Sequence, residues 1–204
     1  MAVYTLKGKQ MTKKILTTAL IASTMTLMAE GSMTAEKKEI MMEGVKYIKI
    51  LGKELKTNVG SRLKKDPTGL KAVTFCSENV KEVAQKVFAD FPAHVKVRRT
   101  ALKYRNPDNK PDATDTKTME QIVAAMKAGT FNKKPVVVDM GENHFRVYAP
   151  LMVEKACTKC HGDTAKMNPE VRKVIQKKYP KDLATGFKEN DFRGVAVAEI
   201  TTKK

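Results

Sequence analysis

The sequence contains no tryptophan, few aromatic residues and only three cysteines. Aromatic residues make up 6% of the 204 residues, so a large planar cofactor would find its apolar contacts mainly among aliphatic side chains and methionine. Three cysteines are too few for a disulfide scaffold. The hydrophobic fraction of 42% and the charged fraction of 30% are ordinary for a globular protein, and they argue against extensive disorder or a multi-pass membrane protein.

Acidic residues are in short supply. There are 39 Lys and Arg against 22 Asp and Glu, a formal net charge of +17. Four of the lysines precede residue 15, so a chain that loses its N-terminus carries about +13. The basic residues are scattered, which fits an acidic protein partner or anionic lipid headgroups, or serves solubility alone. Without a recognition motif or an arginine-rich arm, we expect no nucleic-acid partner.

No apolar run is long enough for a good membrane span. Lys13 and Lys14 precede Ile15 to Ala29, a weakly apolar, threonine-rich segment, whereas a span needs about 20 residues. This pattern predicts a secretory signal over residues 1–35, cleaved between Ala29 and Ala35, with Met11 as a candidate start. We therefore expect export to the periplasm, with membrane association only if the segment stays uncleaved.

The rest of the chain alternates helical and strand patterns. Residues 36–65 are predicted as an N-terminal helix and residues 66–204 as one domain. Asp66 and Pro67 are typical of an N-cap and first helical position. Further helices are expected over 67–91, 115–128 and 169–178, and strands over 94–100, 135–139, 145–149 and 194–201. This order predicts an α+β fold in which helices flank a small antiparallel sheet.

The most informative motif is Cys157-Thr-Lys-Cys160-His161. C-x-x-C-H is the attachment signature of haem c: each thiol forms a thioether with a haem vinyl group, and the adjacent histidine becomes an axial ligand of the iron. A C-x-x-C pair is also found in redox disulfides and in zinc sites. The motif does not follow a strand in a βαβ unit, and no second pair supplies zinc ligands. One covalent haem is therefore predicted.

The pattern leaves the sixth iron ligand open. Cys76 lies on the apolar face of its predicted helix, where a structural thiol is also common. His94 and His144 lie beside predicted strand ends and fit surface positions. Four methionines are further candidates, each also suited to core filling: Met126, Met140, Met152 and Met167.

Several ordered segments resemble one family. They are Lys71–Cys76, Val97–Thr100 with Tyr104–Pro107 and Asn109–Asp112, Tyr148–Pro150 leading into the C-x-x-C-H motif, and three short blocks, Tyr179–Asp182, Ala184–Phe187 and Asp191–Gly194. Together they resemble the PAS-like monohaem c-type cytochromes, long catalogued as a domain of unknown function. The set spans about residues 67–200 and is more specific than the haem motif alone.

The resemblance implies a PAS-like antiparallel sheet and an unusual pair of axial ligands, His161 and the Cys76 thiolate. It also implies that Arg98, Arg99 and Arg105 bind the haem propionates, although a solvated strand face explains the same residues. Ala101 and Leu102 depart slightly from the family pattern, and this affects no ligand.

Two functions fit these expectations. A periplasmic electron carrier would use a thiolate ligand that lowers the haem potential, and it would dock an acidic redox partner. Alternatively, redox change or a diatomic gas displaces Cys76 in a sensor module. Two strong ligands leave no open iron position, so we expect no enzyme activity. Because no output domain is apparent in these residues, we favour the carrier over the sensor.

Overall fold

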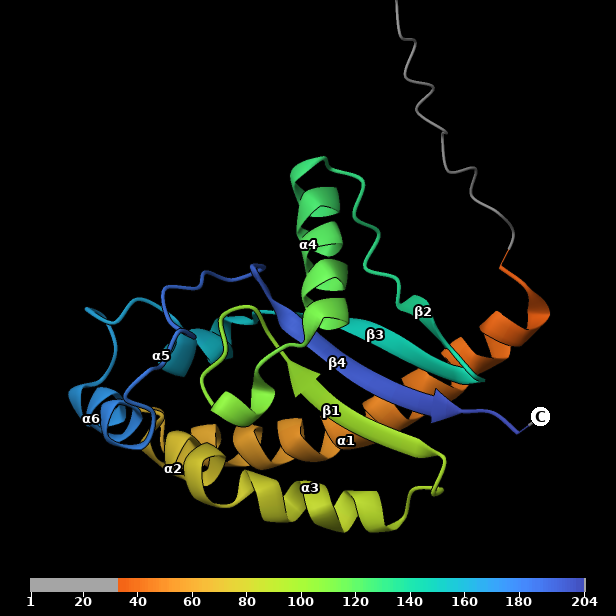
Figure 1. Ribbon diagram of the computed structural model, residues 1–204. Helices are drawn as coiled ribbons and strands as arrows, with labels where there is room; N and C mark the ends of the chain where they lie inside the picture. The colour runs from red at the N-terminus through yellow and green to blue at the C-terminus, as the bar shows by residue number, and fades with distance from the viewer. Residues whose placement is uncertain (1–32, 204) are drawn as a thin grey trace, which may run out of the picture. The chain divides into compact units, whose positions relative to one another are not determined.

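A computed structural model describes residues 33–203 (Figure 1). The predicted signal segment falls almost entirely on residues 1–32, outside the described residues. The four strands are β1 (Val95–Thr100), β2 (Val136–Gly141), β3 (His144–Met152) and β4 (Phe192–Thr201), in the antiparallel order β1-β4-β3-β2. The helices are α1 (Ala35–Lys65), α2 (Leu70–Glu78), α3 (Val80–Ala89), α4 (Ala113–Lys127), α5 (Thr158–His161) and α6 (Pro169–Lys178), with 3₁₀ turns η1 (Pro107–Asn109) and η2 (Lys155–Cys157). The predicted α+β class with an antiparallel sheet is confirmed.

The β2–β3 hairpin forms where the sequence predicts it. Glu142 and Asn143 join the strands, with φ angles of 52° and 61°. Two successive left-handed residues make the type I′ turn whose twist matches that of paired strands. The hairpin therefore fixes the register of β3, which in turn pairs with the central strand β4.

The sheet separates two apolar cores, because alternate residues of β4 point to opposite faces. Ala196, Ala198 and Ile200 pack with α1 and with the partly buried face of α3. Val195 and Val197 pack with Met119 and Ile122 of α4 on the other face. Both faces of β4 are thus covered, as Figure 1 shows.

Two buried ion pairs attach α4 to the sheet. Asp112 and Asp115 form a capping box at the start of α4. Asp115, only 1% exposed, accepts two hydrogen bonds from Arg98 of β1, at 2.7 and 2.9 Å, and one from the Tyr148 hydroxyl at 3.0 Å. Arg146 of β3 contacts the same carboxylate at 3.3 Å. The N-terminus of α4 is therefore anchored to both β1 and β3.

The segment predicted as one helix over 67–91 is two helices. The predicted start at Asp66 and Pro67 is wrong: α2 begins at Leu70, after Gly69 adopts a φ of +92°. Asp66 instead ends α1, and its carboxylate accepts hydrogen bonds from Thr68 and from the Lys71 backbone. Asn79 then separates α2 from α3. None of the helices within residues 33–203 is both long and apolar enough to cross a membrane.

Candidate functional site

The C-x-x-C-H motif forms a short helical segment at one end of the sheet. Cys157 ends η2, whereas Cys160 and His161 belong to α5. Cys157 packs near Val153 and Phe187, and Cys160 packs near the apolar residues of α2 and α6. All three cysteines of the chain are free. Burial raises the pKa of Cys160 to about 11, so this thiol is protonated at neutral pH.

His161 is held as a neutral imidazole. Its Nδ1 lies 2.8 Å from the Ala184 carbonyl oxygen and donates to it, which leaves Nε2 as a free acceptor. Burial, together with the positive charges of Arg105 and Arg193, lowers the pKa of His161 to about 3. A neutral ring fixed by a backbone carbonyl is the arrangement of a metal-ligating histidine.

Cys76 of α2 belongs to the same charge cluster. Burial raises the pKa of its thiol, and the positive charges of Arg99, Arg105 and Arg62 oppose that rise. Cys76 in turn acts on the pKa of Cys160, so the two sulfurs share one environment. The structure therefore brings Cys76 to the C-x-x-C-H segment, from which it is 81 positions distant in the sequence.

Arg105 connects the backbone segments on either side of His161. Its Nη2 donates to the carbonyl oxygens of Cys160, at 2.6 Å, and Ala184, at 3.3 Å, and to the Asp182 carboxylate at 3.0 Å. Its Nε is buried with no hydrogen-bond partner among the described residues. The two backbone acceptors flank His161, so Arg105 positions the turn that carries the imidazole.

Arg98 does not join this cluster, contrary to the prediction. Alternation along β1 places it on the α4 face of the sheet, where its guanidinium is bound to Asp115 and Glu199. Arg99 lies on the opposite face and acts on the pKa of both Cys76 and His161. Of the predicted pair of neighbours, only Arg99 is part of the site.

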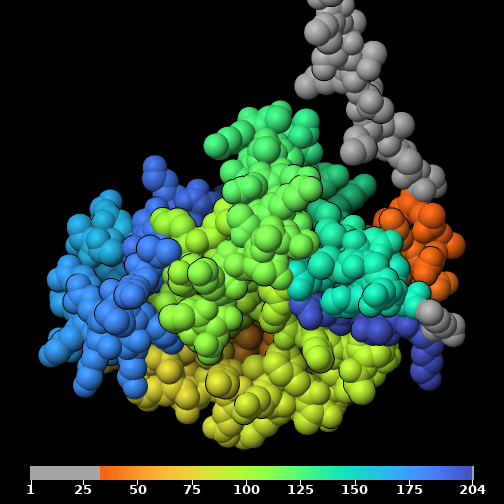
Figure 2. Space-filling view, viewed as in Figure 1, coloured from red at the N-terminus to blue at the C-terminus, as the bar shows by residue number. Residues whose placement is uncertain are grey.

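The members of the cluster are partly covered by the protein. Burial is the largest influence on the pKa of Cys76, Arg99, Cys160, His161 and Arg193, yet each retains accessible surface. Figure 2 shows the surface hollowed between α2 and the segment preceding α4, with atoms of α1 visible at the bottom.

The other candidates for a sixth ligand lie elsewhere or are committed to packing. His94 is exposed and contacts Glu43 at 3.0 Å, and His144 lies at the hairpin end of β3. Met140 is exposed. Met126, in α4, packs against the apolar core between α4 and the sheet, and Met167 is buried against α6. Met152 is partly exposed near the end of β3.

Sequence reasoning missed three members of the cluster. Arg193 had no predicted role, although it lies in one of the segments that resemble the family. Burial and repulsion from Arg105 and Arg99 lower its pKa to about 10. The other two are the Ala184 carbonyl and Asp182, whose roles no sequence pattern indicates. Within residues 33–203, no group of three or more His, Cys, Asp or Glu side chains is placed to bind a metal ion.

Comparison with known proteins places the chain in a family. A family model described as Tll0287-like matches residues 9–201. The chain belongs to the Tll0287-like family. A search of solved structures found the crystal structure of the cyanobacterial heme-protein Tll0287, with a TM-score of 0.59 and 22% sequence identity, covering 85% of this chain and 99% of that one. This likeness shows a shared fold, and no curated protein matches the chain.

Proposed function

We propose that this protein is a PAS-like monohaem c-type cytochrome that transfers single electrons in the periplasm. The observation that carries the proposal is His161, whose Nδ1 donates to the Ala184 carbonyl directly after a Cys157-x-x-Cys160 pair. This geometry leaves Nε2 available as an axial ligand beside the two thiols that would form thioethers. The likeness to a heme-protein supports the same cofactor.

The cluster also offers cations for the two carboxylates of haem. Arg99 and Arg193 form no ion pair with any residue of the described chain, and Arg105 has only Asp182. Each of these arginines acts on the pKa of His161, so three cations gather around this residue while a single carboxylate pairs with one of them. Cations left without a carboxylate favour an anionic ligand, and the partnerless buried Nε of Arg105 is one donor available to a propionate. Arg99 and Arg105 are the propionate ligands we propose.

Cys76 is the proposed sixth ligand. It is the one remaining thiol, and it shares an environment with Cys160 and Arg99. Iron would hold it as a thiolate despite the burial that raises the pKa of the free thiol. Haem supplies a one-electron couple, and a thiolate ligand lowers its potential relative to a His/Met site. With His161 and Cys76 both holding the iron, the chain would leave it no free position for a substrate, and we propose a carrier and not an enzyme.

Export and basic charge complete the proposal. Thioether attachment of haem c takes place outside the cytoplasm, and residues 1–35 have the pattern of a secretory signal. The excess of lysine favours an acidic redox partner.

The first experiment establishes the cofactor. Protein produced with a c-type maturation system should stay red on a denaturing gel and give a c-type pyridine haemochrome with one haem per chain. His161→Ala should keep the thioethers but change the spectrum, whereas Cys157→Ala with Cys160→Ala should lose covalent haem. Complete extraction of haem by acid acetone would refute the proposal.

The second experiment tests Cys76. Cys76→Ser should retain covalent haem, lose the low-spin thiolate spectrum in the ferric state, and raise the potential, because the charge donor is gone. Ser77→Ala is the matched control, since the neighbouring hydroxyl bonds only to the Thr74 carbonyl. An unchanged spectrum and potential in Cys76→Ser would make Cys76 a structural thiol.

A haem-based sensor is the second candidate function. Helix α2, which carries Cys76, packs against both α1 and α6, and Arg62 of α1 lies over the Phe75 ring at 4.0 Å. Displacement of Cys76 would therefore reach α1 directly. Binding of nitric oxide with a change in protease sensitivity of α1 would favour the sensor, and saturation without such a change would favour the carrier.

A further inference from the structure

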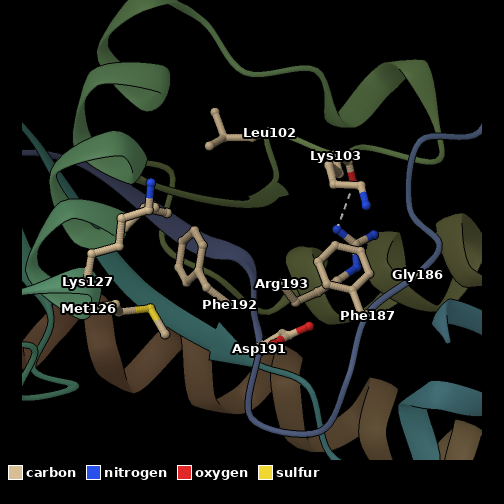
Figure 3. Close-up of a pocket in the computed structure, with 10 residues that line it drawn as sticks. Leu102, Lys103, Met126, Lys127, Gly186, Phe187, Asp191, Phe192 and Arg193 are labelled. Carbon is tan, nitrogen blue, oxygen red and sulfur yellow. Dashed lines mark hydrogen bonds between the residues drawn. The ribbon is translucent and has the colours of Figure 1, made fainter. Parts of the chain in front are cut away.

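A cavity lies beside the C-x-x-C-H cluster, on the α4 face of the sheet. Its volume is about 480 Å³, within the range of small-molecule sites. Figure 3 shows Met126 and Lys127 of α4 on one side, the Phe192 ring near the middle, and Lys103, Arg193 and Phe187 on the other side. We call it the α4 groove. None of the three cysteines lines it, and His161 does not line it either.

The lining of the α4 groove has a definite chemistry. Leu102, Val123, Met126, Phe187 and Phe192 provide an apolar surface. Lys103, Lys127 and Arg193 provide three cations, none of which forms an ion pair within the described part of the chain. The single lining carboxylate, Asp191, already accepts a hydrogen bond from the Lys188 backbone at 2.6 Å.

Two of the cations are fixed in place. Lys103 Nζ donates to the Thr185 carbonyl at 2.7 Å and lies 4.7 Å from the centre of the Phe187 ring. Arg193 donates to the Lys103 carbonyl at 2.9 Å and lies 5.3 Å from the same ring. The positive side of the groove is thus built before any ligand arrives, which lowers the cost of binding.

We propose that the α4 groove binds a small amphipathic carboxylate, an organic anion with an aromatic or medium-chain apolar body. The apolar body would lie against Phe192 and Met126, and the carboxylate would face the cations. The apolar surface gives affinity and the unpaired charges select an anion over a neutral analogue.

The groove is linked to the candidate haem site through one segment. Phe187 and Gly186 line the groove, and their backbone amides donate to the carbonyl oxygens of His161, at 3.0 Å, and Gly162, at 2.8 Å. A ligand that orders residues 186–193 therefore also acts on the turn that carries His161. We propose that occupancy of the groove shifts the haem spectrum and potential; this second part rests on the proposed function.

Calorimetry on the haem-loaded full chain tests the binding. Decanoate and benzoate are the probes, with decanol and benzamide as neutral analogues and sulfate as an inorganic anion. We expect one site per chain for a carboxylate probe, with weaker binding of its neutral analogue and of sulfate. Lys127→Gln should weaken carboxylate binding about three- to tenfold and leave the neutral analogue unaffected. Lys117→Gln, an exposed lysine of α4 outside the groove, is the matched control and should change nothing.

Several outcomes would overturn the site. The first is equal binding of the carboxylate probe and of its neutral analogue or sulfate. The second is an equal loss of affinity in Lys127→Gln and Lys117→Gln, and the third is no binding of either carboxylate. The last is binding to haem-free protein that haem loading abolishes, which would make the groove part of the haem site. A Soret shift and a potential change on titration, absent in Lys127→Gln at the same probe concentration, would support the link to His161. Binding without either change would overturn the link alone. A chain that never acquires haem but binds the probe would refute the proposed function and leave the site intact.

Discussion

At the scale of single residues, Arg105 organises the candidate site. One guanidinium nitrogen bonds to two carbonyls around His161 and to Asp182, whose side chain is 9% exposed. An arginine at this position acts as a connector of backbone segments as well as a charge. Lysine is not an equivalent replacement, because a rotatable ammonium lacks the fixed planar geometry of the guanidinium.

We expect Arg105→Ala to destabilise the protein by about 3–5 kcal/mol, because it leaves the buried Asp182 carboxylate unpaired. Arg105→Lys should cost less but remain clearly destabilising. The measurement is the urea midpoint at constant m-value. Lys86→Ala, which breaks the exposed pair with Glu82, is the control and should change stability by less than about 0.5 kcal/mol. Equal effects in Arg105→Ala and Lys86→Ala would contradict this account.

Tyr148 makes the stability of the folded protein depend on pH in the alkaline range. Burial raises its pKa to about 12, and Asp115, which accepts a hydrogen bond from the Tyr148 hydroxyl, contributes to the rise. Unfolded tyrosine titrates near 10, so between about pH 10 and 12 the unfolded chain loses a proton that the folded chain keeps. The stability that Tyr148 contributes is therefore complete below about pH 10 and declines as the pH rises towards 12.

Tyr148→Phe tests that dependence. The variant should be less stable than the parent by about 1 kcal/mol near pH 8, because Asp115 loses a donor. The difference should shrink as the pH approaches 11, since only the parent has a tyrosine to ionise at this position. Urea unfolding of both proteins across this range cancels the common titration of lysines. A difference that stays constant with pH would show that Tyr148 titrates normally.

The sequence predicted the site only where the functional residues form a recognisable motif. Cys157, Cys160 and His161 are adjacent in the chain, and alternation along β1 could have shown that Arg98 and Arg99 point to opposite faces. The roles of Arg105 and Ala184 depend on the fold, because a backbone carbonyl has no sequence signature. The sequence does not distinguish Arg193 from the other basic residues, and only its position in β4 places it beside the cluster.

At the scale of elements, α1 lies unusually close to the sheet at one position. A Cβ added to Gly44 would lie 2.6 Å from a methyl carbon of the fully buried Val147. Gly52, in the same helix, has no neighbouring atom within 4 Å of such a Cβ. The absence of a side chain at Gly44 therefore permits the contact between α1 and β3.

Two substitutions in α1 should have opposite signs. Gly44→Ala should destabilise by about 1–2 kcal/mol, because overpacking against Val147 exceeds the gain in helix propensity. Gly52→Ala should stabilise by up to about 1 kcal/mol, since only the propensity changes. Thermal melting of the two variants beside the parent measures both. Stabilisation by both substitutions would mean that the sheet yields easily at this contact.

The elements themselves were largely predictable, apart from one region. Periodicity located α1, α4 and α6, because each buries one regular stripe, and the four strands were located from short apolar runs between turn residues. It failed between residues 66 and 91, where the apolar spacing continues across Asn79 although the helix does not. A local break at one residue leaves the pattern unchanged, so only packing against α1 and α6 reveals it.

At the scale of the whole molecule, charge is the dominant property. The formal net charge of +17 produces a field that extends over a screening length of about 30 Å at 0.01 M salt and about 10 Å at 0.1 M. Encounter with an acidic partner should therefore be fast and sensitive to salt.

We expect the rate of electron exchange with a small acidic flavoprotein to fall at least tenfold as the ionic strength rises from about 0.01 to 0.5 M. Stopped-flow absorbance in the Soret region measures the rate. Reduction by an uncharged small molecule is the control and should vary little over the same range. A salt-independent rate with the acidic protein would show that its docking does not use the basic surface.

The order of the strands also governs when the molecule can form. Strand β4 pairs with both β1 and β3, and it follows both in the chain. The residue pair Val95 and Ile200 joins positions 105 apart, so closing the sheet is a long-range step. Until residues 192–201 have left the ribosome, β1 has no strand partner and α1 has no complete surface to cover. A nascent chain with this topology therefore stays open through most of its synthesis, and Cys157 and Cys160 stay accessible until the sheet closes.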